Sequence, residues 1–448
     1  MGLLKKDKDN GYISAKESHR IAKENRKITG EIEKKRNRKH IPEEEYITKM
    51  KNPDNCVEFD NVHTYFFTDI GTVKAVDGVS FDVPQGKTVG IVGESGCGKS
   101  VTSLSLMQLV QRPTGQTVEG EIRFDDGNRT YNIVNTPTSV MQKLRGNYMS
   151  MIFQEPMTSL NPVFRIGDQV DEVIALHYPE KSKEEVKART LEMLEMVGIA
   201  NKEGVYRMYP HELSGGMRQR IMIAMALACD PKLIIADEPT TALDVTIQTQ
   251  IVELLKDINK SEQNAMLFIT HDLNLARRIC HKIVVMKDGV VQQVDTPQNL
   301  YNAPGNLFVA GFIGSPQMNF LDAKVKVNGN DVTLTVGKYN MKLPASKAKA
   351  VIDGGYDGKT VVMGIRPENV HDSQMFIETS KDSVVECKIN VYELLGAEVY
   401  LYFDCEGFPM TARVDPRTTA RSGDTVKFAL DMEKVHLFDK ETEITITN

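Results

Sequence analysis

The stretch Gly93-Glu94-Ser95-Gly96-Cys97-Gly98-Lys99-Ser100 decides the fold of this chain. It follows the β-branched run at residues 88–92 and opens a segment of helical character, which is the strand, loop and helix order of a phosphate-binding loop. Glycines let the backbone wrap tightly, so that successive N–H groups and the positive end of the helix dipole point at one anion. The sequence therefore predicts a nucleotide-binding loop in which Lys99 contacts the β- and γ-phosphates and Ser100 ligates Mg²⁺.

The composition is that of a globular chain. Its 448 residues and 41% hydrophobic content suffice for two or three domains with their own cores. No apolar run approaches the roughly 20 residues of a membrane helix, and the first residues lack the apolar stretch of a signal peptide. The six cysteines include no Cys-x-x-Cys pair, which favours reduced thiols over a disulfide frame or a zinc site. These features predict a cytoplasmic protein.

The charge is unevenly distributed along the chain. Residues 1–54 carry 15 basic and 10 acidic side chains, whereas the whole chain has a net charge of −6. The main body is therefore acidic, which makes nucleic acid a poor candidate partner. Because the first 54 residues are also poor in apolar side chains, they predict a basic, mostly disordered extension. The alternative is a helix with Ile21, Ile28 and Ile32 on one face, which would suit an anionic membrane surface or a partner.

Two later strand patterns end in polar residues. Residues 148–153 predict a buried strand that ends at Gln154, and residues 233–236 predict a fully apolar strand that ends in Asp237 and Glu238. With a phosphate loop upstream, this carboxylate pair fits an arrangement in which Asp237 holds Mg²⁺, directly or through water, and Glu238 activates water. The alternative is a strand that ends at the solvated surface, because carboxylates are costly to bury without partners.

Three further features remain open on residue pattern alone. Phe66 lies in an aromatic cluster and either stacks on a nucleotide base or packs in a core. Ser214-Gly215-Gly216 opens a helical pattern and is either an anion-binding helix start or an ordinary capped one. His271 follows an apolar strand, at the edge where α/β sheets bind ligands, although a lone His is more often structural.

The residue pattern changes in the last third of the chain. From about residue 316 the helical patterns end, and alternating strand-like runs separated by Gly and Asn-Gly turns begin. This pattern predicts a separate all-β domain, in the form of a small barrel.

The order and spacing of five elements resemble those of the ATP-binding-cassette (ABC) ATPases, which drive membrane transporters. The resemblance covers residues 56–315, and the five elements are the phosphate loop, Gln154, Leu213-Ser214-Gly215-Gly216, the strand ending in Glu238 with the following Ala242-Leu243-Asp244, and His271. Residues 151–162 and 213–220 are similar to the ATPase subunits of oligopeptide and dipeptide importers. Residues 308–316 and 364–368 instead resemble the junction and regulatory domain of maltose and multiple-sugar importer ATPases.

The resemblance implies an architecture. It predicts an α/β P-loop NTPase domain at residues 55–315, with a RecA-like core, an antiparallel β subdomain and a helical subdomain at about residues 155–225. An OB-like, all-β regulatory domain then occupies residues 316–448.

The resemblance also implies site roles. Phe66 would stack on adenine, Glu238 would be the general base and His271 would contact the γ-phosphate, while Gln154 would contact both Mg²⁺ and the attacking water. The implied Mg²⁺ ligands are Ser100, Gln154 and Asp237. The implied ATP-binding set is Phe66, Gly93, Glu94, Ser95, Gly96, Cys97, Gly98, Lys99, Ser100, Val101, Ser214, Gly215, Gly216, Met217 and Asp244.

The implied partners follow from these roles. In the family, Ser214 and Gly216 serve the ATP of the opposite subunit, so the resemblance predicts a head-to-tail dimer with a second cassette, either the same chain or a homologue. Two transmembrane permease subunits and, indirectly, an extracytoplasmic binding protein complete the assembly at the cytoplasmic face of the membrane. The segment after Gln154, with Met157, Leu160 and Pro162, would receive a short permease helix.

The resemblance predicts an ATPase that drives oligopeptide or dipeptide import. One alternative is the ATPase of a maltose or multiple-sugar importer. An alternative from another class is a soluble, non-transport ABC ATPase, which would lack a membrane partner.

Overall fold

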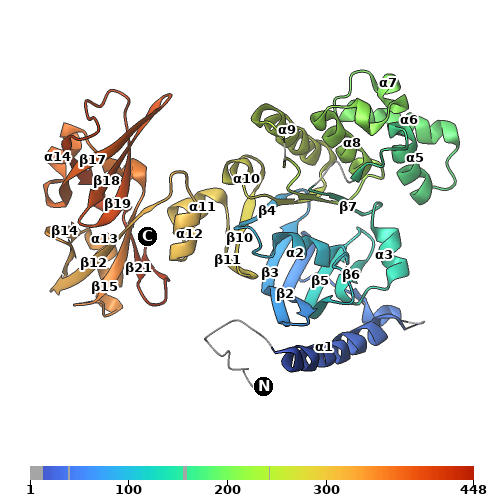
Figure 1. Ribbon diagram of the computed structural model, residues 1–448, viewed down its shortest axis with the longest axis horizontal. Helices are drawn as coiled ribbons and strands as arrows, with labels where there is room; N and C mark the ends of the chain where they lie inside the picture. The colour runs from blue at the N-terminus through green and yellow to red at the C-terminus, as the bar shows by residue number, and fades with distance from the viewer. Residues whose placement is uncertain (1–13, 39–40, 155–158, 242) are drawn as a thin grey trace. The chain divides into compact units, whose positions relative to one another are not determined.

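The computed structural model describes residues 14–38, 41–154, 159–241 and 243–448 (Figure 1). The chain divides into two compact units, residues 1–294 and 295–448. Within the described residues, no helix is both long enough and apolar enough to span a membrane.

The core of the first unit is a sheet with the strand order β11-β10-β4-β9-β8-β7, in which the strands from β10 to β7 run parallel. β4, β8 and β9 are buried along their whole length, because continuous apolar runs suit strands that are covered on both faces. The parallel alignment brings the carboxyl ends of these five parallel strands to one edge. The strands are β4 (Thr88–Gly93), β7 (Met149–Ile152), β8 (Leu233–Asp237), β9 (Ala265–Ile269), β10 (Lys282–Lys287) and β11 (Val290–Asp295).

A second, antiparallel sheet with the order β1-β6-β5-β2-β3 completes the β part of this unit. One hydrophobic core joins the two sheets, and within it the rings of Phe59 and Phe81 stack with centroids 4.4 Å apart. Figure 1 shows α2 (Lys99–Leu106) on this side of the parallel sheet. The strands are β1 (Ile47–Thr48), β2 (Asn55–Thr68), β3 (Gly71–Pro84), β5 (Gly115–Asp125) and β6 (Thr130–Asn132).

Helices cover the other side of the parallel sheet (Figure 1). Among them, α6 (Lys183–Met196) begins with a capping box between Ser182 and Glu185 and ends just before Gly198, where φ is 79°. The other helices on this side are α5 (Ile166–His177), α7 (Lys202–Arg207), α8 (Gly215–Leu227), α9 (Val245–Glu262) and α10 (Leu273–Ile279). Helix α3 (Thr138–Leu144) instead lies beside β6, on the side of α2, and buries Met141 and Leu144 in the core that joins the two sheets.

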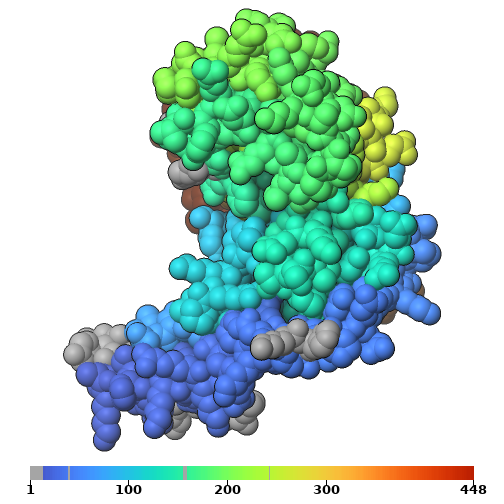
Figure 2. Space-filling view, turned by 90° about the vertical axis from the view of Figure 1, so that its right-hand side faces the viewer, coloured from blue at the N-terminus to red at the C-terminus, as the bar shows by residue number. Residues whose placement is uncertain are grey.

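The N-terminal extension differs from the expectation of disorder, because residues Ala15–Arg36 form helix α1. The helix contacts the antiparallel sheet, and Asn25 Nδ2 donates a hydrogen bond to the carbonyl of Thr68 at 2.8 Å. In Figure 2, α1 is the dark blue segment at the lower edge of the view. The segment cannot bury enough apolar surface by itself, but it does so by packing against the antiparallel sheet. Composition describes the segment alone and therefore does not reveal this packing.

The second unit begins with two short helices, α11 (Pro297–Asn302) and α12 (Leu307–Phe312), and continues into two sheets. Their strand orders are β14-β13-β12-β15-β21-β22 and β16-β20-β17-β18-β19, and one hydrophobic cluster lies between them. The strands are β12 (Asn319–Asn328), β13 (Asp331–Val336), β14 (Tyr339–Leu343), β15 (Thr360–Ile365), β16 (Val370–His371), β17 (Val384–Leu395), β18 (Glu398–Cys405), β19 (Phe408–Val414), β20 (Thr425–Leu430), β21 (His436–Asp439) and β22 (Thr445–Thr447). Two helices that the strand pattern does not predict, α13 (Ala345–Asp353) and α14 (Gln374–Thr379), interrupt them.

The boundary between the two compact units, after residue 294, lies earlier in the chain than the domain boundary that the sequence predicts after residue 315, and that domain boundary stays a prediction. Residues 295–315 belong to the second unit, because Arg366 donates hydrogen bonds to the carbonyls of Ile313 and Tyr301 at 2.7 and 2.6 Å. The backbone N–H of Leu307 also donates to the carbonyl of Glu443 at 2.9 Å. Contacts so distant along the chain carry no local sequence signal.

Candidate active site

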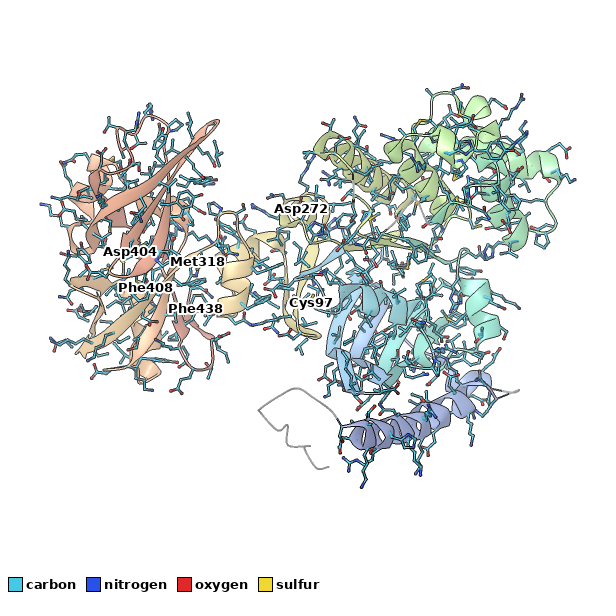
Figure 3. The ribbon with its side chains drawn as sticks, viewed as in Figure 1. Cys97, Asp272, Met318, Asp404, Phe408 and Phe438 are labelled. Atoms are coloured by element: carbon cyan, nitrogen blue, oxygen red, sulfur yellow. The ribbon has the colours of Figure 1, made fainter. Side chains whose placement is uncertain are left out.

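The phosphate loop closes tightly between β4 and α2. A Cβ atom at Gly98, where φ is 100°, would lie 2.2 Å from the carbonyl oxygen of Ala75 on β3. A Cβ atom at Gly93 would lie 2.3 Å from the carbonyl oxygen of Met286 on β10. Both positions therefore require glycine. Cys97, labelled in Figure 3, lies in the same loop, and its burial raises the pKa of the thiol, so that this side chain is neutral.

Lys99 lies at the centre of this loop. Its side chain is 5% exposed, and Nζ donates to the carbonyls of Gly93 and Glu94, each at 2.9 Å. Carbonyls satisfy the donors of an ammonium group but do not neutralise its charge. The loop therefore holds a buried positive charge suited to an anion. Next to Lys99, Val101 packs against the core, whereas Glu94, Ser95 and Gly96 are exposed along the rim of the loop.

Ser100 and Asp237 meet at the edge of the sheet, where Ser100 Oγ donates to Asp237 Oδ1 at 3.0 Å. Asp237 ends β8 and is 5% exposed. Burial raises the pKa of its carboxyl group to about 6, and the neighbouring Glu238 adds to the rise. A divalent cation beside Asp237 would relieve this unfavourable charge.

These residues fit a Mg²⁺ ion. Hydroxyl, carboxylate and amide oxygens are hard donors, and Mg²⁺ is usually held by one or two carboxylates together with substrate phosphates. Within the described residues, no group of three His, Cys, Asp or Glu side chains could hold a metal ion by itself. The donor set therefore suits an ion that arrives with a nucleotide better than one held by protein alone.

Glu238 lies at the centre of a second cluster, built from the ends of three strands. Gln154, which follows β7, donates from Nε2 to Glu238 Oε2 at 2.8 Å. His271, which follows β9, has Nδ1 3.5 Å from Glu238 Oε1. The backbone of Glu238 has φ 44°, and its N–H donates to the carbonyl of Ile269 at 2.9 Å. The cluster holds an oriented carboxylate whose side chain is 15% exposed, which can accept a proton from water.

Sequence reasoning missed Thr241 in this cluster. Its hydroxyl donates to Glu238 Oε2 at 3.2 Å, so that this oxygen accepts from both Gln154 and Thr241. A hydroxyl residue three positions after the second carboxylate is the signal that could have indicated it.

The remaining predicted residues form a second, separate set. Ser214 caps α8, and its Oγ accepts a hydrogen bond from the N–H of Met217 at 3.3 Å. A Cβ atom at Gly216 would lie 2.9 Å from Ile247, and Gly215 faces Leu243. Asp244 caps α9 by accepting from the N–H of Ile247 at 2.9 Å. The structure thus brings the starts of α8 and α9 together.

Phe66 and the segment after Gln154 belong to neither of the sets of residues described so far. Phe66 is half-buried on β2, opposite Val73 and Gly115, with its ring against Gly115. Its stacking on adenine stays a prediction. In the segment after Gln154, Leu160 is buried and Pro162 is exposed. Met157 and Ala242 lie outside the described residues.

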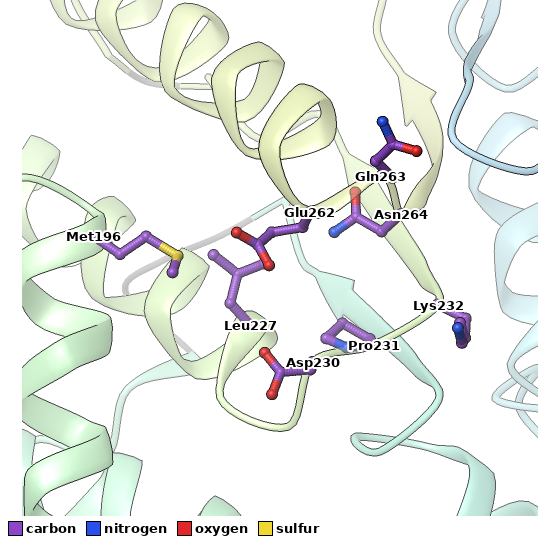
Figure 4. Close-up of a pocket in the computed structure, with 8 residues that line it drawn as sticks. All are labelled: Met196, Leu227, Asp230, Pro231, Lys232, Glu262, Gln263 and Asn264. Carbon is purple, nitrogen blue, oxygen red and sulfur yellow. The ribbon is translucent and has the colours of Figure 1, made fainter.

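A pocket at the opposite end of the parallel sheet is not part of this site (Figure 4). It lies at the amino ends of β8 and β9, whereas the phosphate loop and Glu238 follow carboxyl ends. Its lining consists of Met196, Leu227, Asp230, Pro231, Lys232, Glu262, Gln263 and Asn264.

Comparison with known proteins agrees with this geometry. Residues 76–241 match the ABC transporter family, residues 314–370 match the MalK OB fold domain and residues 379–437 match the TOBE domain. The oligopeptide transport ATP-binding protein AppD of Bacillus subtilis is 48% identical over 259 residues, which cover 58% of this chain and 77% of that protein. The oligosaccharides import ATP-binding protein MsmX of the same organism is 34% identical over 384 residues, covering 86% of this chain and 98% of that protein. The dipeptide transport ATP-binding protein DppD of B. subtilis is 42% identical over 273 residues, covering 61% and 80%.

The chain therefore belongs to the ATP-binding proteins of ABC transporters. It is an ATP-binding ATPase with an ABC fold followed by MalK-type OB and TOBE domains, as the sequence predicted.

Proposed function

We propose that this chain hydrolyses ATP to drive the import of oligopeptides or dipeptides through an ABC transporter. The observation that carries the proposal is the arrangement around Glu238, a carboxylate held by Gln154, Thr241 and His271 beside the phosphate loop. Glu238 acts as the general base, and Gln154 positions the attacking water. His271 contacts the γ-phosphate. Mg²⁺, when bound by Ser100, Asp237 and Gln154, neutralises charge on the phosphates.

The nucleotide is bound between two cassettes. Ser214, Gly215, Gly216, Met217 and Asp244 act on the ATP held by a second cassette, arranged head to tail. Supporting this, Ser214 and Asp244 are exposed and lie near each other at the starts of two helices. A helix N-terminus carries unsatisfied N–H groups and a partial positive charge, which suit a phosphate.

A permease is the expected membrane partner, at the cytoplasmic face. The surface near Gln154 exposes three large apolar side chains, Phe153, Val163 and Phe164, with exposed fractions of 41%, 72% and 53%. Exposed apolar groups gathered near a site suit a protein contact. Leu160 is buried and therefore does not contact the partner directly.

Peptides are the proposed cargo. Of the three relatives described above, the two with the higher identities, AppD and DppD, are named for oligopeptide and dipeptide transport. Oligosaccharide import is the second candidate. It is favoured by the sugar-importer relative, which matches both units of the chain, and by the MalK-type domains.

The test is uptake by cells that lack the gene and carry a plasmid copy. Wild-type chain is expected to restore uptake of a labelled oligopeptide, and Glu238→Gln is expected to fail. Glu262→Gln, which makes the same change outside the site, serves as the control. Restored uptake of a labelled oligosaccharide, with peptide uptake unchanged, would favour the second candidate and refute the first.

A further inference from the structure

The outward face of helix α1 carries basic side chains. Asn25 and Thr29 are buried where the helix contacts the antiparallel sheet, and Lys27 lies two positions from each of them, which places it on the opposite side of the helix. Figure 1 shows α1 at the edge of the first unit, with the antiparallel sheet on one side of it. The outward face of the helix is therefore open to solvent.

Four exposed lysines lie in a row along this outward face. They are Lys16, Lys23, Lys27 and Lys34, and the seven- and four-residue steps between them are close to whole turns of an α-helix. At a rise of about 1.5 Å per residue, the row is about 27 Å long. These four side chains, named the lysine row, can therefore all meet one flat surface at the same time.

The charge of the lysine row is not neutralised by the described part of the chain. None of the four lysines forms an ion pair there, whereas Arg20, on the same side of the helix, is paired with Glu17 at 2.7 Å. Helix α1 exposes seven Lys and Arg side chains but only two acidic ones, Glu24 and Glu31. Its exposed surface therefore has a net charge of +5, although the whole chain has a net charge of −6.

The residue type and the shape of the lysine row favour an extended anionic surface over a single small ligand. Lysine is a point charge on a flexible stem, whereas arginine pairs with a phosphate group in a fixed bidentate geometry. Point charges spread along a straight helix suit a partner with many negative charges and no defined shape. A membrane surface with anionic phospholipids is of this kind, and clusters of about four to eight Lys and Arg residues on a helix are typical of proteins that bind it.

We propose that the lysine row binds the headgroups of anionic phospholipids, so that α1 is a contact between this chain and the membrane surface. The inference rests on the proposed function, because a permease would hold the chain beside a membrane. Salt screens charges that are more than about 10 Å apart, so the acidic remainder of the chain does not cancel this local attraction. The contact is electrostatic, since Ile28 is the one exposed isoleucine of α1 and Ile21 and Ile32 are half-buried.

Sedimentation of the full chain with lipid vesicles tests the proposal. One set of vesicles consists of phosphatidylcholine, which has no net charge, and the other of equal amounts of phosphatidylcholine and anionic phosphatidylglycerol. The chain is expected to bind the anionic vesicles and not the neutral ones, and the bound fraction should fall as salt is added. Each lysine beside an anionic surface should contribute about a fivefold increase in partitioning.

The test variant replaces the whole lysine row by glutamine, which removes the charge but has a similar helix propensity. Its partitioning to anionic vesicles should fall by more than about a hundredfold. Replacement of the row by arginine should preserve binding, because the charge is kept. The matched control loses the same total charge at four exposed lysines of the second unit and should bind as the wild type does; it combines Lys324→Gln, Lys326→Gln, Lys349→Gln and Lys388→Gln.

The proposal is overturned if the wild type binds neither kind of vesicle or both equally, or if the test variant binds as strongly as the control. Binding to a single-stranded RNA without binding to anionic vesicles would assign the lysine row to nucleic acid and would also overturn it. The vesicles contain no permease, so a failure here leaves the proposed import function standing. Conversely, vesicle binding by a chain that restores no uptake in cells would refute only the proposed function.

Discussion

Glu238→Gln is expected to separate ATP binding from ATP hydrolysis. The substitution removes the proposed base but leaves Lys99, Ser100 and Asp237 in place, and an amide can still accept the hydrogen bonds from Gln154 and Thr241. Steady-state phosphate release should fall by about 10²- to 10⁴-fold, the usual contribution of a general base, with ATP affinity retained. Glu262→Gln is the control, and undiminished turnover in Glu238→Gln would refute the assignment.

Asp237 is expected to make the nucleotide-free protein less stable as pH rises. Its pKa is raised from 3.8 to about 6 on folding, so the folded state holds the proton more tightly than the unfolded state does. The stabilisation by the protonated form is complete below about pH 4 and is lost as pH rises to about 6. At pH 8, Asp237→Asn should therefore raise the free energy of unfolding by about 3 kcal/mol, from 1.36 kcal/mol per pKa unit.

The measurement is the melting temperature of Asp237→Asn and wild type at pH 5 and pH 8, without nucleotide or metal. The gain in melting temperature should be larger at pH 8. Asp257→Asn, at an exposed position on α9, is the control and should show no such difference. A gain that is equal at both values of pH would mean that Asp237 is not the titrating group.

At the scale of the elements, helix α1 is expected to open locally more often when the hydrogen bond between Asn25 and Thr68 is removed. In Asn25→Ala, the carbonyl of Thr68 loses a donor that lies at 2.8 Å, and a buried hydrogen bond of this kind contributes about 1 kcal/mol. Amides of residues 15–36 should exchange about fivefold faster, which is the factor that corresponds to that energy. Glu24→Ala, one position away on the exposed side of the helix, should leave exchange unchanged.

The elements also show what sequence can predict. The parallel strands at Gly93, Gln154, Asp237 and His271 were predictable, because each is a short apolar run that leads into the phosphate loop or into a polar residue, and parallel strands place such ends at one edge. Helix α1 was not, because its stability comes from Thr68 and Gln116, far away along the chain. The proximity of the starts of α8 and α9 likewise depends on packing between Gly216 and Ile247, which no motif encodes.

For the whole molecule, the position of the unit boundary predicts which truncation folds. A chain that ends at Val294 keeps the first unit intact and is expected to bind ATP, since every proposed catalytic residue precedes it. A chain that ends at Ser315 retains α11 and α12 without the sheets of the second unit, and so exposes Ala310, which packs with Met318 and Phe438 in the full chain. It should bind ATP but aggregate more readily, as measured by light scattering during melting. Loss of ATP binding in a folded chain ending at Val294 would overturn this boundary.

Two defective chains should restore one another if the nucleotide lies between two cassettes. Lys99→Ala removes the charge at the centre of the phosphate loop, and Ser214→Arg places a bulky cation at the start of α8. In a head-to-tail dimer of one chain of each kind, one site contains both substitutions and the other contains neither. The mixture should therefore bind and hydrolyse ATP, whereas each variant alone should be inactive. Because the pairing cassette can be a homologue, the experiment is repeated with that chain supplied. Normal hydrolysis by either variant as a monomer would exclude the shared site.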